Sequence, residues 1–167
     1  FLCEDFVRDK DAVSACAILA EIAAWAKDQG ITLYQLLEKI YVEYGFSKEK
    51  GISVVKKGKS GAEEIDAMMK KFRENPLTEI AGSKVTNFYD YASLKGIDYT
   101  ENETITLDMP TTSNVLQYFT EDNTKVSIRP SGTEPKIKFY FGVKGVSLED
   151  SQAKLDALSA EVLGQFE

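Results

Sequence analysis

The chain contains no histidine among its 167 residues, and this absence excludes several kinds of active site. Histidine is the commonest general base and metal ligand, and the Ser–His and Cys–His nucleophiles both require it. Only two cysteines occur, Cys3 and Cys16, which are too few to form a zinc site alone. We expect free thiols in a cytoplasmic protein, with a disulfide between the two as the less favoured alternative.

An excess of basic charge and long hydrophobic runs are also missing. The 20 Lys and Arg residues face 27 Asp and Glu, which gives a net charge of −7 and counts against a nucleic-acid partner. No apolar run is long enough to cross a bilayer, so the sequence predicts no membrane partner. A content of 43% hydrophobic and 28% charged residues is typical of a globular protein.

The pattern of residues 9–29 predicts a first helix. Asp9 and Asp11 stand at its start and Gly30 follows its end. Its middle is apolar almost all the way round, and such a helix is normally sandwiched inside a larger fold.

A second helix is expected over residues 32–44. It opens with a capping-box pattern, Thr32 with Gln35, and Gly45 ends it. Leucine and tyrosine side chains share one face at helical spacing, and we expect this stripe to be core.

After Gly45 the pattern changes to period-two alternation, which indicates strands. A capping box at Ser60 predicts a helix ended by Asn75-Pro76, and Ser147 caps a last helix. The class expected is α+β: two N-terminal helices, then a mostly antiparallel sheet of four to six strands with helices packed on one face. The expected strands are 52–56, 84–91, 104–107, 115–120, 125–129 and 136–143.

One segment, residues 129–138, carries recognisable chemistry. Two prolines bracket four residues whose backbone N–H groups have neither helix nor strand to serve, and the glycine among them allows close approach of a ligand. Two hydroxyls add donors, an arginine offers a planar fork that matches two phosphate oxygens, and two lysines add positive charge. The segment predicts a phosphate site with the candidate residues Arg129, Ser131, Gly132, Thr133, Lys136 and Lys138.

The same residue types also occur in ordinary turns, so a strand connection that binds no ligand is the alternative interpretation. Glu134 counts against the phosphate site unless its carboxylate points away, because it would repel a phosphate.

Residues 129–140, Arg-Pro-Ser-Gly-Thr-Glu-Pro-Lys-Ile-Lys-Phe-Tyr, closely resemble the C-terminal phosphate-binding loop of the α-D-phosphohexomutase superfamily. The match is closest to the phosphoglucomutase/phosphomannomutase branch. Residues 6–11 resemble the segment that enters the closing helix of the family's third domain, and residues 56–59 resemble the opening of the fourth. The resemblance spans nearly the whole chain and is sharpest over residues 126–142.

The resemblance implies a four-domain enzyme of carbohydrate metabolism, an isomerase of the intramolecular phosphotransferase type. It moves a phosphoryl group between the 1- and 6-positions of a hexose phosphate such as glucose or mannose phosphate. In that family a phosphoserine of the first domain donates the group, the second domain holds Mg²⁺, and the fourth holds the phosphate that does not react. Residues 1–46 would then be the helical tail of the third domain and 47–167 the fourth domain.

Carried over to this sequence, the family's phosphate-binding positions match the six candidate residues, with the two lysines as weaker matches. Arg8 and Lys10 match a basic pair at the active-site rim. The nucleophile loop and the Asp-rich metal loop have no counterpart here, and the chain begins at Phe1 rather than methionine. We therefore expect a fragment with no catalytic residue or metal site of its own, inactive without the other domains. We expect the fourth domain to close over the substrate about a hinge at residues 45–51.

Two alternatives remain, a non-enzymatic module whose sheet lies across a macromolecule and a free-standing anion sensor. The net charge of −7 counts against the first. The apolar first helix counts against the second, because it needs a sheet that this chain does not contain. We also expect that helix to associate with another copy, since burial of apolar area gains roughly 25 cal/mol per Å².

Overall fold

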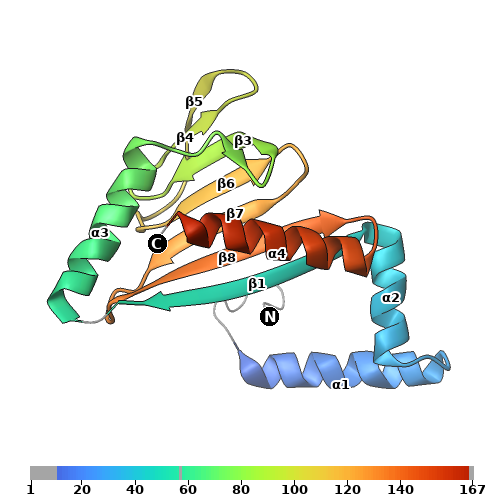
Figure 1. The fold of residues 1–167 in the computed structure, drawn as a ribbon. Helices are drawn as coiled ribbons and strands as arrows, with labels where there is room; N and C mark the ends of the chain where they lie inside the picture. The colour runs from blue at the N-terminus through green and yellow to red at the C-terminus, as the bar shows by residue number, and fades with distance from the viewer. Residues whose placement is uncertain (1–10, 57, 166–167) are drawn as a thin grey trace. The chain divides into compact units, whose positions relative to one another are not determined.

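The computed structural model describes residues 11–56 and 58–165 (Figure 1). The chain divides into two compact units, Phe1–Gly45 and Phe46–Glu167. The rim pair Arg8 and Lys10 lies outside the described residues, as does Cys3.

The first unit contains the two expected helices, α1 (Ala12–Asp28) and α2 (Leu33–Tyr44). Asp11 caps α1 through its side chain. The capping box of α2 is confirmed in both directions. The Thr32 N–H donates to Gln35 Oε1 at 2.8 Å, and the Gln35 N–H donates to Thr32 Oγ1 at 3.2 Å.

The apolar faces of these helices are not buried. Only Ala26 of α1 is buried and no residue of α2 is, so the prediction that the leucine and tyrosine stripe is core is wrong for this chain. Cys16 is an exposed free thiol. Across the described stretches, no helix combines the length and apolar character needed to span a membrane. The exposed large apolar side chains of the unit are Val13, Leu19, Trp25, Leu33, Tyr34, Leu37, Ile40, Val42 and Tyr44.

The second unit is built on an antiparallel sheet of eight strands with the order β1-β8-β7-β6-β3-β4-β5, and β2 pairs with β3. The α+β class is confirmed, but the expected four to six strands are too few, because the two-residue β2 and the short β4 were not predicted. The strands are β1 (Phe46–Val55), β2 (Glu79–Ile80), β3 (Ser83–Asp90), β4 (Lys95–Asp98), β5 (Glu103–Thr106), β6 (Leu116–Thr120), β7 (Lys125–Pro130) and β8 (Lys136–Gly145).

The expected hinge over residues 45–51 is wrong from Phe46 onward. Strand β1 begins at Phe46 and pairs with β8 over its whole length, from Phe46 opposite Gly145 to Val55 opposite Lys136. The glycine and charged residues of this stretch suggested a linker, but ladder pairing with β8 makes it part of the sheet.

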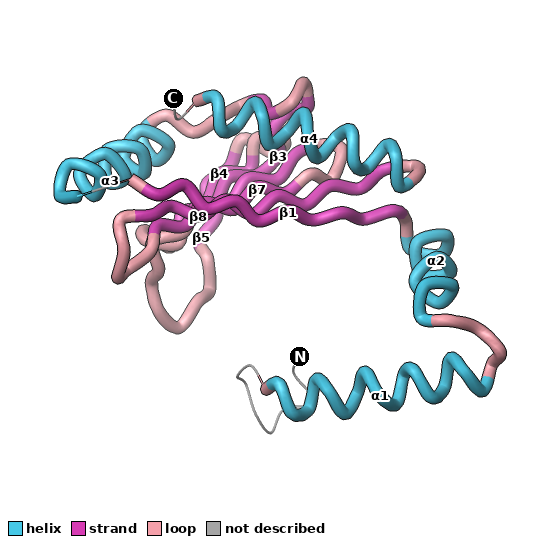
Figure 2. Tube along the Cα trace, turned by 60° about the horizontal axis from the view of Figure 1, so that its bottom comes forward, coloured by secondary structure: helices cyan, strands magenta, loops and turns pink. Residues whose placement is uncertain are grey.

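The two helices of this unit, α3 (Gly58–Glu74) and α4 (Leu148–Gly164), lie on the same face of the sheet (Figure 2). Helix α3 begins at Gly58, so Ser60 lies inside the helix and is not its cap as predicted; the helix ends before Asn75-Pro76 as expected. Ser147 caps α4 as predicted, and its Oγ accepts from the Asp150 N–H at 3.1 Å.

The core lies between the helices and one face of the sheet. On β8 the predicted alternation is confirmed: Ile137, Phe139, Phe141 and Val143 are all buried in it. The residues between them point to the opposite face, which neither α3 nor α4 covers (Figure 2). The sheet therefore has one dry face and one face open within its unit.

The glycines of the sheet give a test of this packing. A Cβ at Gly96 would lie 2.6 Å from Tyr89 Cδ1 and 2.9 Å from the Phe88 carbonyl oxygen. We expect Gly96→Ala to lower the free energy of unfolding by about 2 kcal/mol. At Gly142 the nearest atoms lie 4.0 Å away, so Gly142→Ala should stay within about 0.5 kcal/mol of the parent chain. Urea unfolding followed by circular dichroism measures both, and equal stability of the two variants would contradict the packing.

Candidate functional site

The predicted phosphate loop connects β7 to β8, at the end of the sheet where α3 begins (Figure 1). The Ser131 N–H donates to the Lys136 carbonyl at 2.8 Å, and the Lys136 N–H donates to the Glu134 carbonyl at 2.7 Å. The Lys56 N–H donates to the Pro135 carbonyl at 2.9 Å, which ties the connection to the end of β1. The loop is thus held at both sides by backbone hydrogen bonds.

The four loop amides differ in their availability. The Ser131 N–H donates to the carbonyl of Lys136, the first residue of β8, so the prediction that it has no backbone partner is wrong. The Thr133 N–H lies 3.5 Å from Ser131 Oγ, at the limit of a hydrogen bond. The N–H groups of Gly132 and Glu134 have no partner among the described residues, and both residues are exposed. Two amides can therefore donate to a ligand.

Arg129 and Lys138 lie directly opposite each other on β7 and β8. Both face away from the core, because their neighbours Ile128 and Phe139 point into it. Neither cation makes an ion pair with any described residue, and Arg129 is exposed. Side chains opposite each other in an antiparallel pair have their Cβ atoms about 5 Å apart, so an anion bound between these two side chains is within reach of both cations.

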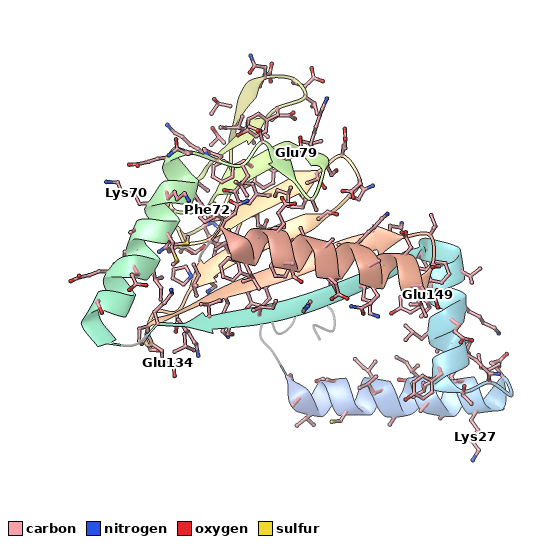
Figure 3. All side chains as sticks on the ribbon, in the orientation of Figure 1. Lys27, Lys70, Phe72, Glu79, Glu134 and Glu149 are labelled. Atoms are coloured by element: carbon pink, nitrogen blue, oxygen red, sulfur yellow. The ribbon has the colours of Figure 1, made fainter. Side chains whose placement is uncertain are left out.

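Lys136 and Glu134 form an ion pair with each other. The Lys136 ammonium, through its hydrogen bond and its charge, lowers the pKa of the Glu134 carboxyl below its ordinary value. Glu134 lies at the tip of the β7–β8 connection (Figure 3). Its negative charge is therefore partly compensated, and Lys136 is less available to a ligand than Lys138.

The candidate residues line two different cavities. The loop, residues 131–134, lines a cavity of about 520 Å³ together with the first turns of α3, including Gly58 and Ala62. Arg129 lines another cavity of about 490 Å³ on the open face of the sheet. The structure brings Arg129 and Lys138 together, but it does not bring Arg129 and the loop amides around one cavity.

The open-face cavity contains residues that the sequence reasoning missed. They stand at alternate positions of neighbouring strands, and the same period-two pattern that located the core could have found them. Among the described residues, no group of three or more His, Cys, Asp or Glu side chains could hold a metal ion. The polar residues missed are Glu49, Gln117, Lys125, Ser127 and Tyr140.

Comparison with known sequences matches most of the second unit to one protein family. Residues 52–163 match the sequence model of a family described as phosphoglucomutase/phosphomannomutase, C-terminal domain. A phosphoglucomutase from Staphylococcus aureus (strain bovine RF122 / ET3-1) is 37% identical over 158 residues, which cover 95% of this chain and 28% of that protein. One from Staphylococcus haemolyticus (strain JCSC1435) is 36% identical over 143 residues, covering 86% and 26%. The chain thus spans little more than a quarter of the length of these relatives.

A solved structure shows the same fold. The open form of parafusin, a phosphoglucomutase from Paramecium, has a TM-score of 0.50 with this chain at 15% sequence identity, and the match covers 96% of this chain and 28% of that one.

Proposed function

Because the chain belongs to the phosphoglucomutase/phosphomannomutase family, we propose that it is the C-terminal portion of a phosphohexomutase and binds the phosphate of a hexose phosphate that does not react. Residues 1–46 would be the tail of the third domain and 47–167 the fourth domain. The parent enzyme would transfer a phosphoryl group between the 1- and 6-positions of glucose or mannose phosphate, in the cytoplasm. Its Mg²⁺ would be bound by a domain outside this chain.

The observation that carries this proposal is Arg129 beside Lys138, without an ion pair to any residue that the structure describes, at the point where the exposed loop leaves the sheet. A guanidinium fork next to an ammonium suits a dianionic phosphate, and charge-assisted hydrogen bonds of this kind are roughly twice as strong as neutral ones. The N–H groups of Gly132 and Glu134, which have no partner in the described part of the chain, and the hydroxyl of Thr133 are further donors, but they line the neighbouring cavity beside α3. None of these groups contacts the sugar in this proposal. The same residues would therefore bind either the 1-phosphate or the 6-phosphate when a bisphosphate intermediate reorients between the two transfer steps.

The role of such a site is to bind and orient the substrate. Interactions with a remote phosphate are the same in the ground state and the transition state, so they raise the occupancy of the active site and position the reacting end. Phosphoryl transfer also needs a nucleophile and several cationic groups acting together. In this proposal the other domains supply them.

Arg129→Ala tests the site. We expect the variant to bind inorganic phosphate and glucose 6-phosphate about tenfold more weakly, because it loses a charge-assisted hydrogen bond. Amide chemical shifts of the 167-residue chain, followed by NMR during titration, measure both affinities. Lys84→Ala on β3 removes the same charge far along the sheet order and is the matched control. Equal affinity of the Arg129 variant and the control would overturn the assignment.

The isolated chain should be catalytically inactive. We expect no conversion of glucose 1-phosphate to glucose 6-phosphate when the pure 167-residue protein is incubated with Mg²⁺ and glucose 1,6-bisphosphate. A phosphate-binding site alone neither donates nor accepts the phosphoryl group. Measurable conversion above a buffer blank would refute this part of the proposal.

The exposed apolar side chains of α1 and α2 support self-association of the isolated chain. We expect the sedimentation coefficient to rise with protein concentration, and Trp25→Glu, at a side chain 52% exposed, to reduce that rise. A monomer over the whole concentration range would contradict it.

A further inference from the structure

The open face of the sheet carries side chains in three rows that run across the strands. Each row joins residues paired in the registers of β1 with β8, β8 with β7 and, in the first two rows, β7 with β6. The first row is Glu49, Gly142, Lys125 and Phe119; the second is Gly51, Tyr140, Ser127 and Gln117; the third is Ser53, Lys138 and Arg129.

Small residues make a hollow in the first two rows. Gly142 and Gly51 present no side chain to this face, and Ser127 presents only a hydroxymethyl group. The longer side chains around these three residues therefore enclose a depression in the surface. The hollow is the cavity of about 490 Å³ that Arg129 also lines. This volume is within the range of small-molecule sites.

The polar groups around the hollow include donors and acceptors without partners. Ser127 is 9% exposed, and its hydroxyl makes no hydrogen bond with any described residue. The hydroxyl of Tyr91 donates to Gln117 Oε1 at 2.9 Å, which fixes the amide and leaves its NH₂ group as a donor. Tyr140 is 44% exposed, and its ring lies next to Gly51, with Cδ1 3.8 Å from the position that a Cβ at Gly51 would take.

The charges are arranged unequally along the hollow. Arg129 and Lys138 form a cationic end, and Glu49 stands at the opposite end with no ion pair to any described residue. The Lys125 ammonium lies 5.8 Å from the centre of the Phe119 ring. Positions 125 and 129 of β7 are about 13 Å apart along the strand. Such a site suits a ligand with one anionic end and a neutral body rich in hydroxyl groups.

We propose that this hollow binds the sugar ring of a hexose phosphate whose phosphate lies between Arg129 and Lys138. Glu49 accepts hydrogen bonds from the ring hydroxyls, Ser127 and Gln117 donate to them, and the Tyr140 ring packs on the C–H face. The inference rests on the proposed function and extends it, because it gives this domain a part in binding the sugar as well as its phosphate.

A polyanion such as a nucleic acid strand fits this face less well. Its phosphates would repeat along the strands, but the end of the hollow away from Arg129 holds the opposite charges of Glu49 and Lys125 in one row, so a second phosphate meets no net positive charge there. A single phosphate at the Arg129 end needs no second cationic site, and a hydroxyl at the Glu49 end gains an acceptor.

Filling the hollow tests the inference. In the parent chain we expect glucose 6-phosphate to bind about five- to tenfold more tightly than inorganic phosphate, since two or three neutral hydrogen bonds add to the phosphate contacts. Gly142→Leu should remove this difference and leave the affinity for inorganic phosphate within about twofold. Gly142→Ala is the matched control and should keep the difference, because a methyl group has room there. NMR titration of the 167-residue chain with both ligands measures the two affinities.

A second variant covers the outcome in which Gly142→Leu fails to fold. Glu49→Gln is isosteric at an exposed position, and we expect it to reduce the difference between the two ligands about threefold or more. The inference would be overturned if glucose 6-phosphate bound no more tightly than inorganic phosphate to the parent chain. It would also be overturned if Gly142→Leu kept the difference in affinity between the two ligands. If the leucine variant is unfolded, the same difference kept in Glu49→Gln would overturn it. Failure of the proposed function is read separately, as loss of inorganic phosphate binding itself.

Discussion

The strand β8 is the constraint on which this domain depends. It is hydrogen-bonded to β1 on one side and to β7 on the other, and its residues alternate between a buried face and an open one. Burial of Phe139 and Phe141 fixes the register, because a slip of one residue would turn both rings to the open face. The same register sets Lys138 opposite Arg129 and Tyr140 opposite Ser127. Core packing on one face therefore positions the candidate binding residues on the other.

Much of this fold could be predicted from the sequence, because strong local signals agree with the final structure. The capping box at Thr32, the cap at Ser147 and the alternation over β8 all lie where expected. The misses have local causes. Strand β2 has two residues, too few for a pattern, and Phe46–Gly51 is a strand only because β8 supplies its hydrogen bonds. Helix α3 begins at Gly58, two residues before the cap predicted at Ser60, because a glycine is not a typical signal for the start of a helix.

The candidate site could be predicted only in its contiguous part. Arg129, Lys138 and the loop between them stand in one run of sequence, so their types and order could be interpreted together. The hollow on the open face is assembled from four strands that are distant in sequence, and no single segment contains its pattern. The leucine and tyrosine stripe of α2 shows the reverse limit. Its spacing indicates a buried face, but burial depends on what packs against the helix, and within this chain that face stays exposed.

Strand β1 is the terminal strand of the sheet order, and this position has a consequence for the behaviour of the domain in solution. Along its outer side it presents a row of backbone N–H and C=O groups over ten residues, which is a template for pairing with a foreign strand. The charged run Lys48, Glu49 and Lys50 stands in the middle of that edge, and Lys50 is anchored to Asp156 of α4 at 3.3 Å. Charged side chains on an edge oppose the addition of another chain, so this charged run protects the domain from aggregation.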